Sequence, residues 1–222
     1  MSQSKYLAIL ILIGGKSARF GVEKAAIDLL GKPLILHQIE TLSKHDEDLF
    51  LVAHSEEQIF NYRKKINFPK EVTFIIDDRE IFQHTHMFKP MLGIYSGLKE
   101  LKRLDFQKVF LLSCDMPLIK SEVIQLMIDK SKGYDCCIPR WKNGFLEPFF
   151  AIYPVYEGLE RAKQILITEN YGLHNFIDKE WNINYISVED SIEPLDTNLL
   201  SLLNINGPID IAKLMDLYKK TV

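Results

Sequence analysis

Residues 6 to 24 read YLAILILIGGKSARFGVEK and decide the fold. The eight apolar residues at the start predict a buried strand, and the Gly-Gly pair that follows predicts that this strand runs into a loop. Glycine lets backbone N–H groups come close to an anion. Three basic residues follow in the same loop: Lys16, Arg19 and Lys24. We therefore expect the loop to bind phosphate groups, as a nucleoside triphosphate would supply.

Two common phosphate loops do not fit this stretch. A Walker loop that ended in Gly15-Lys16-Ser17 would need glycine at position 10, which is Leu10, and no Gly-x-Gly-x-x-Gly run is present. A signal peptide is disfavoured because the apolar run lacks a small-residue cleavage site and continues into charged residues. The remaining alternative is a glycine-rich turn between a strand and a helix whose charges are solvated.

The composition narrows the class of protein. A chain of 222 residues with 47% hydrophobic content is long enough for one large domain with a substantial core. A net charge of −3 gives no general attraction to nucleic acid or to an anionic membrane, and no apolar run approaches the ~20 residues that span a bilayer. Three cysteines, two of them adjacent, give no disulfide framework. We expect a cytoplasmic protein that binds neither nucleic acid nor membrane.

Apolar periodicity along the chain predicts alternating strands and helices. Strands are expected at 6–13, 49–53, 72–76, 108–113, 134–139, 149–153, 182–188 and 202–206. Helices are expected at 34–44, 56–65, 91–103, 122–132 (capped by Ser121), 155–166 and 208–219, with a helical turn in 170–178 and an acidic loop at 189–196. This order predicts an α/β fold with a mostly parallel sheet, in which ligands bind beyond the carboxyl ends of the strands. The loops that begin at Gly14, Asp77 and Cys114 should therefore meet at one edge.

The loop at residues 12–24 resembles the signature loop of the sugar-phosphate and cofactor nucleotidyltransferases, and is most similar to that of the MobA-like molybdenum cofactor guanylyltransferases. Relatives that transfer CMP usually begin the loop with Ala-Gly, whereas this chain has Gly14-Gly15. The resemblance implies a single-domain, Rossmann-like three-layer sandwich with a mostly parallel mixed sheet, of the nucleotide-diphospho-sugar transferase type. It also implies one domain over residues 1–222, with a nucleotide-binding N-terminal half and an acceptor-binding C-terminal half.

The resemblance further implies an enzyme that transfers GMP from GTP to the phosphate of molybdopterin and releases pyrophosphate, with Mg²⁺ as cofactor. GTP and molybdopterin would be its substrates, and proteins that deliver or accept the molybdenum cofactor would be transient partners. Such a reaction brings two anions together, so it needs cations rather than a side-chain nucleophile. Two alternatives stay open: transfer of CMP or another nucleotide to a pterin or other phosphorylated small molecule, and a nucleotide-binding protein without turnover.

Three motifs that match the family contain the expected catalytic and metal residues. Asp115 lies in Cys-Asp-x-Pro, which matches the family's magnesium motif, although it could instead cap the next helix. By the same resemblance, Arg19 neutralises the β- and γ-phosphates, and Lys24 meets the α-phosphate or the incoming group. Asn206 lies in a run that matches the family's Asn-x-Asn-x-Pro-x-Asp and joins Asp115 as a metal residue, with helix capping as its alternative role.

The nucleotide is expected to contact the loop, the metal carboxylate and two further positions. The expected residues are Leu12, Ile13, Gly14, Gly15, Lys16, Ser17, Lys24, Asp78, Gly93 and Asp115. Asp78, or Asp77 in its place, could accept N–H bonds from guanine, although both could be solvated turn residues. Gly93 ends a segment similar to the family's Gly-Pro-Leu-x-Gly, in which Lys89 replaces the first glycine.

The acceptor half matches the family less closely. The stretch at 171–175 lacks the arginines that follow the family's glycine, Gly172 here. His174 could take their place, or the loop at 140–143 could, since its Trp141 would stack on a planar ring beside positive charges. We expect Cys114 to be a packing residue, and the pair His84 and His86 to lie in a polar loop rather than at a metal.

Overall fold

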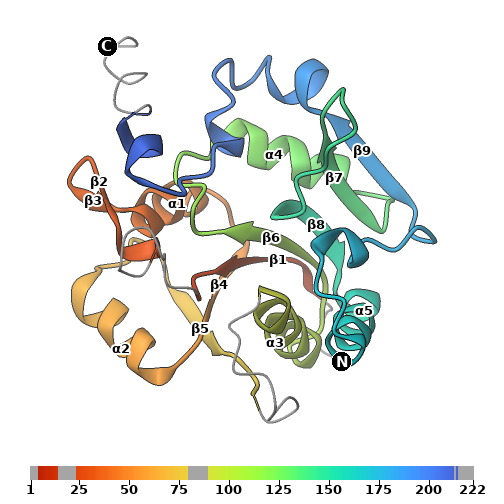
Figure 1. Ribbon diagram of the computed structural model, residues 1–222, viewed down its shortest axis with the longest axis horizontal. Helices are drawn as coiled ribbons and strands as arrows, with labels where there is room; N and C mark the ends of the chain where they lie inside the picture. Colours follow the sequence, from red (N-terminus) through yellow and green to blue (C-terminus); the bar gives the residue numbers. More distant parts are fainter. Residues whose placement is uncertain (1–4, 15–23, 80–89, 213, 215–222) are drawn as a thin grey trace.

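The computed structural model describes residues 5–14, 24–79, 90–212 and 214. Within these ranges a seven-stranded sheet has the order β5-β4-β1-β6-β8-β7-β9 (Figure 1). Its strands are β1 (Lys5–Leu12), β4 (Asp48–Ala53), β5 (Val72–Ile76), β6 (Phe106–Ser113), β7 (Cys136–Arg140), β8 (Phe150–Pro154) and β9 (Ile183–Ser187). The strand predicted at 72–76 is confirmed to the residue, and the others differ by one or two residues at their ends.

The sheet is mixed because one strand runs against the rest. β1 is parallel to β4 and β6, β4 is parallel to β5, and β7 is parallel to β9. β8 is antiparallel to both β6 and β7, so β7 again runs in the direction of β6. The carboxyl ends of β1, β4, β5, β6, β7 and β9 therefore share one edge, which is where ligands bind in such sheets.

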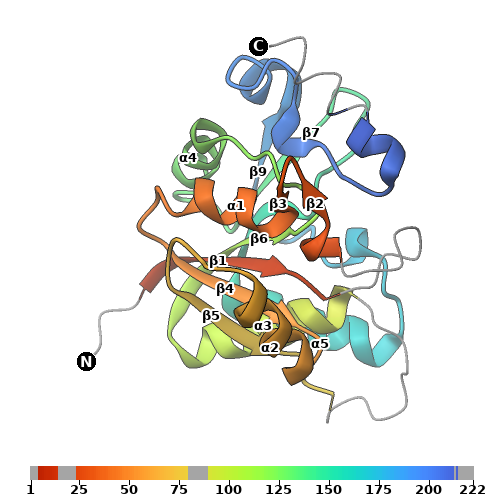
Figure 2. The ribbon, with the colours of Figure 1, turned by 90° about the vertical axis from the view of Figure 1, so that its left-hand side faces the viewer.

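Strand β1 is buried on both faces, so its alternate side chains belong to different cores. Leu7, Ile9 and Ile11 pack with α1 (Leu34–Leu42), α2 (Glu56–Lys65) and α4 (Ser121–Lys130). Ala8, Leu10 and Leu12 pack with α3 (Pro90–Arg103) and α5 (Val155–Thr168). The sheet lies between these two helical layers, with α1 and α4 on one side and α3 and α5 on the other (Figure 2). The predicted three-layer α/β sandwich is confirmed.

Helix α3 comes unusually close to the sheet. A Cβ added at Gly97 would lie 2.3 Å from Cδ2 of Leu10, so only glycine allows this contact. Gly93 lies one turn earlier on the same face of α3, where an added Cβ would lie 3.3 Å from Cδ2 of Leu12. The start of α3 is thus held against the carboxyl end of β1.

The short elements include one hairpin that the sequence did not predict. β2 (Asp28–Leu29) and β3 (Lys32–Pro33) pair antiparallel around Leu30 and Gly31, whose positive φ angles of 55° and 82° suit a tight two-residue turn. The other short elements are η1 (Lys24–Ala26), η3 (Leu173–Asn175), the π-helix η4 (Val188–Ile192) and η5 (Leu200–Leu202). The stretch expected as an acidic loop at 189–196 therefore contains most of a helical turn.

The strand predicted at 202–206 is wrong. Residues 200–202 form η5, and Ile205 donates its N–H to the carbonyl oxygen of Asp115 at 2.8 Å instead of joining the sheet. Its apolar side chain packs in a small separate cluster, which explains the misleading pattern; the members are Ile27, Leu29, Leu34, Ile205 and Leu214. Residues 208–212 are helical, as predicted.

Ser121 does not cap α4 as predicted. Lys120 occupies the cap position, and the Ser121 hydroxyl lies 3.0 Å from Nε2 of His45. In the part of the chain that the structure describes, we find no helix with the length and apolar character needed to cross a membrane.

Candidate active site

Three side chains from distant parts of the sequence meet at the carboxyl edge of the sheet. Lys24 starts η1, Asp115 follows β6, and Asn206 lies near the end of the described chain. Nζ of Lys24 donates to Oδ2 of Asp115 at 2.9 Å and to Oδ1 of Asn206 at 3.0 Å, across 91 and 182 residues of sequence. The structure thus brings together three of the residues expected from the motifs.

Backbone contacts around Asn206 leave its side chain available to the site. The Asp210 carboxylate accepts the N–H groups of Asn206 at 2.8 Å and Gly207 at 2.9 Å, so Asp210 satisfies the backbone at the start of this helix. The neighbouring Ile205 is fastened to the Asp115 loop by its own N–H. The Asn206 amide oxygen faces Lys24 and does not act as a helix cap.

Asp115 is a buried carboxylate that is only half satisfied. The residue is 8% exposed, its Oδ2 accepts from Lys24, and its Oδ1 has no hydrogen-bond partner among the described residues. It caps no helix, because α4 begins only at Ser121. Buried polar atoms are normally paired, so an open carboxylate oxygen beside an amide oxygen is a fit for a hard divalent cation.

The described ranges contain no group of three or more His, Cys, Asp and Glu side chains that could hold a metal on its own. The candidate donor set at the site is therefore one carboxylate and one amide oxygen. This set suits a cation such as Mg²⁺, which typically keeps water and takes its other ligands from substrate phosphates.

Two buried glutamines that the sequence did not single out support the loops of the site. Gln38 on α1 donates from Nε2 to the carbonyl oxygens of Ser113 at 3.0 Å and Met116 at 3.1 Å. Gln58 on α2 donates to the carbonyl oxygen of Ile13 at 3.2 Å. Both are essentially inaccessible to solvent. The only signal in the sequence was a polar residue at an apolar position of a helical repeat.

The loop after β1 is described only in part. The N–H groups of Ile13 and Gly14 both donate to the carbonyl oxygen of Val52, at 3.0 and 3.2 Å, so the sheet already uses them. Leu12 ends β1 and contacts α3. The expected site residues Gly15, Lys16, Ser17 and Arg19 lie outside the described residues, as do Lys89, His84 and His86.

A second polar cluster lies where β5 ends and α3 begins. Asp78 forms an ion pair with Lys99 at 2.5 Å and donates its N–H to the Ser96 hydroxyl. Asp77 lies nearer Gly93, since an added Cβ there would be 3.5 Å from its Oδ1. Burial raises the pKa of Asp77 to about 6, and Arg79 opposes that rise. Asp77 is thus the carboxyl next to Gly93, whereas Asp78 is held by a lysine.

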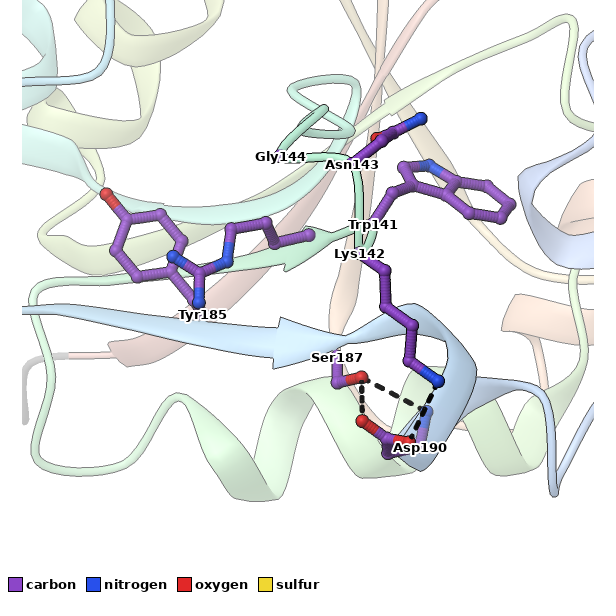
Figure 3. A pocket seen from close by; sticks show the side chains of 8 residues that line it. Trp141, Lys142, Asn143, Gly144, Tyr185, Ser187 and Asp190 are labelled. Atoms are coloured by element: carbon purple, nitrogen blue, oxygen red, sulfur yellow. Dashed lines mark hydrogen bonds and ion pairs between the residues drawn. The ribbon is translucent and has the colours of Figure 1, made fainter.

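A cavity of about 490 Å³ opens at the ends of β7 and β9 (Figure 3). Its lining residues are Arg140, Trp141, Lys142, Asn143, Gly144, Tyr185, Ser187 and Asp190. Lys142 lies 3.5 Å from the carboxylate of Asp190, which also accepts the Ser187 hydroxyl at 2.7 Å. The indole N–H of Trp141 donates to Glu147 at 2.7 Å, which fixes the ring.

Arg140 is the cavity's uncompensated charge. Its guanidinium stacks over the Tyr185 ring at 4.7 Å, and within the described ranges it forms no ion pair with a carboxylate. His174 does not line this cavity and instead covers Gly172, where an added Cβ would lie 2.5 Å from its Cε1. Of the two regions expected to bind the acceptor, the loop at 140–143 is therefore the one that lines this cavity.

The three cysteines are buried free thiols. Burial, with the nearby Asp115 carboxylate, raises the pKa of the Cys114 thiol well above its usual range. Cys114 is buried in the core cluster, as expected of a packing residue, and the raised pKa disfavours the nucleophilic thiolate form.

Residues 9–182 match the MobA-like NTP transferase domain. The chain belongs to this family. One relative, from Thermococcus sibiricus, is named probable molybdenum cofactor guanylyltransferase. It is 33% identical to this chain over 208 residues, which cover 92% of this chain and 95% of the relative. A relative of the same name from Natranaerobius thermophilus is 31% identical and covers 97% and 98% of the two chains.

Solved structures share the fold of the family. The molybdopterin-guanine dinucleotide biosynthesis protein A of Archaeoglobus fulgidus superimposes with a TM-score of 0.75 at 24% identity, covering 96% of this chain and 99% of that one. The 4-diphosphocytidyl-2C-methyl-D-erythritol synthase of Anaerococcus prevotii has a TM-score of 0.66 at 14% identity, with 97% and 99% coverage. The fold is therefore common to proteins named for guanine and for cytidine nucleotides, and the base must be argued from the site.

Proposed function

We propose that the protein transfers GMP from GTP to the phosphate of molybdopterin and releases pyrophosphate, with Mg²⁺ as its metal. In this proposal residues 1–222 form one nucleotidyltransferase domain, whose N-terminal half binds the nucleotide and whose C-terminal half binds the acceptor. The names of the relatives from Thermococcus sibiricus and Natranaerobius thermophilus support this substrate pair.

The observation that carries the proposal is the meeting of Lys24, Asp115 and Asn206 at the carboxyl edge. A nucleotide-binding protein without turnover has no need of a buried metal carboxylate. The open Oδ1 of Asp115 and the amide oxygen of Asn206 supply oxygen ligands for a cation. When bound, Mg²⁺ neutralises phosphate charge as it develops on the leaving pyrophosphate.

Each residue of the site then binds a different charged group in the reaction. An oxygen of the acceptor phosphate attacks the α-phosphorus of GTP, and the bond between that phosphorus and the pyrophosphate oxygen breaks as the new bond forms. Arg19 binds the β- and γ-phosphates, and Lys24 neutralises the α-phosphate or the attacking group. Asp115 and Asn206 hold the cation. Lys24, Asp115 and Asn206 are already hydrogen-bonded to one another, which reduces the reorganisation needed during the reaction.

Selection of guanine is assigned to the cluster at the end of β5. A carboxylate that accepts the ring N–H and the exocyclic amino group of guanine has no equivalent pair of donors on cytosine. Asp77 lies beside Gly93 and is partly buried, and Asp78 is adjacent to it. We assign base recognition to this pair, with Gly93 leaving room for the sugar.

The cavity at Arg140 is a suitable acceptor site because of its position on the sheet. Phe110 pairs with Ile152, and Ile152 pairs with Cys137, so Arg140 is level with Ser113 at the end of β6. Two strand spacings separate these ends by about 10 Å. An acceptor could therefore place its phosphate near Asp115 and its planar ring among the aromatic and charged side chains of the cavity.

The test measures pyrophosphate release from GTP and from CTP, each with and without molybdopterin, under Mg²⁺. Release that requires GTP and molybdopterin together, and that disappears in Asp115→Asn, supports the proposal. A matched control is Asp129→Asn, which changes an exposed aspartate paired with Lys132 on α4. Faster release from CTP would support the cytidylyl alternative, and no release from either triphosphate would overturn the proposal.

A further inference from the structure

Gln38 has a polar side chain at a fully buried position of α1, where an apolar side chain is usual. It lies on the buried face of α1 with no solvent exposure, next to the core residue Ile39. Burying an amide costs free energy unless its groups are hydrogen-bonded. Its Oε1 has no partner in the described part of the chain, so the side chain is retained for its two donors.

Both donors of Gln38 go to the turn that carries Asp115. The Nε2 group donates to the carbonyl oxygen of Ser113 at 3.0 Å and to that of Met116 at 3.1 Å, and these residues flank Cys114 and Asp115. Within the turn, the Met116 N–H donates to the Ser113 carbonyl at 3.3 Å. The two Gln38 bonds therefore hold the turn from outside.

The same turn also sets the position of Asn206. The carbonyl oxygen of Asp115 accepts the N–H of Ile205 at 2.8 Å, and Asn206 is the next residue. A shift of the turn would thus move the Asp115 carboxylate and change the anchor of the Asn206 amide together. One buried amide on α1 therefore bonds to the turn that carries Asp115 and anchors the residue before Asn206.

We propose that Gln38 is a positioning residue that sets the distance between the Asp115 and Asn206 oxygens. This inference rests on the proposed role of those two side chains as cation ligands. Residues that orient metal ligands typically change metal affinity or activity by about 10- to 100-fold when removed. Gln38 is fully buried beneath the turn, so we expect its effect to pass through the turn's carbonyl groups.

The experiment measures Mn²⁺ binding by electron paramagnetic resonance in the absence of nucleotide. Gln38→Met keeps the approximate length of the side chain and removes both donors. We expect its Mn²⁺ dissociation constant to rise about 10-fold. We also expect kcat for GTP to fall by a similar factor while KM for GTP changes less than twofold, because the two bonds that are lost go to the Asp115 turn.

Two control variants separate positioning from loss of stability. Ile39→Val removes one buried methylene from the same helix, and Gln58→Met removes the matching glutamine beneath Ile13. Both should lower the melting temperature and leave the Mn²⁺ dissociation constant within twofold of wild type. If Gln38→Met binds Mn²⁺ as tightly as these controls, the proposal is overturned.

A measurement on the unaltered protein covers the case in which Gln38→Met does not fold. The side-chain amide protons of Gln38 should shift in a ¹⁵N–¹H spectrum when Mg²⁺ is added, while those of Gln58 stay in place; no shift at Gln38 would overturn the proposal. Wild-type protein that fails to bind Mn²⁺, or Asp115→Asn protein that binds it normally, would instead overturn the metal site itself. The two failures are therefore distinguishable.

Discussion

The two ends of the carboxyl edge are organised differently. At the end of β6, Asp115 is buried and is held by Lys24, by the backbone of Ile205 and by Gln38 beneath its turn. At the ends of β7 and β9, the Lys142 and Asp190 side chains are 68% and 69% exposed and 3.5 Å apart. Exposed ion pairs contribute little to stability. The end to which we assign the chemistry is thus held by several buried contacts, whereas the end that we propose for the acceptor is exposed and less constrained.

Removal of the Asp115 charge should have the largest effect on activity, because Asp115 is the carboxylate that we assign to the cation at the end of β6. Asp115→Asn keeps the size of the side chain and removes the charge of the only carboxylate that we assign to the cation. We expect kcat/KM for GTP to fall on the order of 100- to 1000-fold. Pyrophosphate release measures the effect, and far-ultraviolet circular dichroism checks the fold. A fall of less than 10-fold would mean that another group holds the cation.

Replacement of Lys24 should cause the second-largest loss of activity. Lys24→Met removes the ammonium that lies between Asp115 and Asn206, and with it the charge that meets the reacting phosphates. We expect about a 100-fold loss of kcat/KM. Lys32→Met is the matched control, because Lys32 pairs with Glu40 on the surface of α1 and, among the described residues, bonds to no site residue. Equal rates in the two variants would remove Lys24 from the mechanism.

A smaller effect, limited to the KM for the acceptor, is expected at the cavity that Arg140 lines. Arg140→Ala removes the uncompensated charge of the cavity and its stacking on Tyr185. We expect KM for molybdopterin to rise about 10-fold while KM for GTP changes less than twofold. Arg103→Ala, which removes an arginine paired with Glu100 on α3, serves as the control. An increase in the GTP KM alone would place the cavity outside the acceptor path.

The smallest effect concerns stability and its dependence on pH. Burial raises the pKa of Asp77 from 3.8 to about 6, so the folded chain binds this proton more tightly than the unfolded chain does. Stability contributed by protonation is full below pH 4 and is lost as the pH rises through 6. Asp77→Asn should therefore stabilise the protein at pH 8, by on the order of 1 kcal/mol after allowance for solvent screening, and change little at pH 4. Thermal melts at the two pH values measure this difference, and an equal shift at both would contradict it.

The residues that sequence reasoning brought to the site share a simple property. Lys24, Asp115 and Asn206 each lie in a motif. The loops that contain Lys24 and Asp115 each follow a predicted parallel strand, so the direction of the sheet was enough to place them at one edge. The alternation of strands and helices is equally local information, so the layers and the parallel core followed from it. Asn206, which is 182 residues from Lys24, was predicted from its motif alone, because the strand expected at 202–206 does not form.

The features that sequence reasoning missed depend on contacts between distant segments. Gln38 stands at an apolar position of a helical repeat, but its role cannot be inferred until the carbonyl groups that accept its hydrogen bonds are known. The stretch at 202–206 has the apolar pattern of a strand, but its hydrogen bond goes to Asp115 and its side chains pack on the β2–β3 hairpin. The different surroundings of Asp77 and Asp78 likewise depend on a distant residue, because Lys99 forms an ion pair with Asp78.

The small cluster that joins Ile27, Leu29 and Leu34 to Ile205 and Leu214 also affects when the protein becomes active. The ribosome makes the Lys24 and Asp115 segments long before it makes Asn206. The final turn of the site can close only after the segment that contains Ile205 has docked onto the hairpin. A nascent or prematurely terminated chain that lacks Asn206 therefore has an unfinished site, and under the proposed mechanism it would not consume triphosphate.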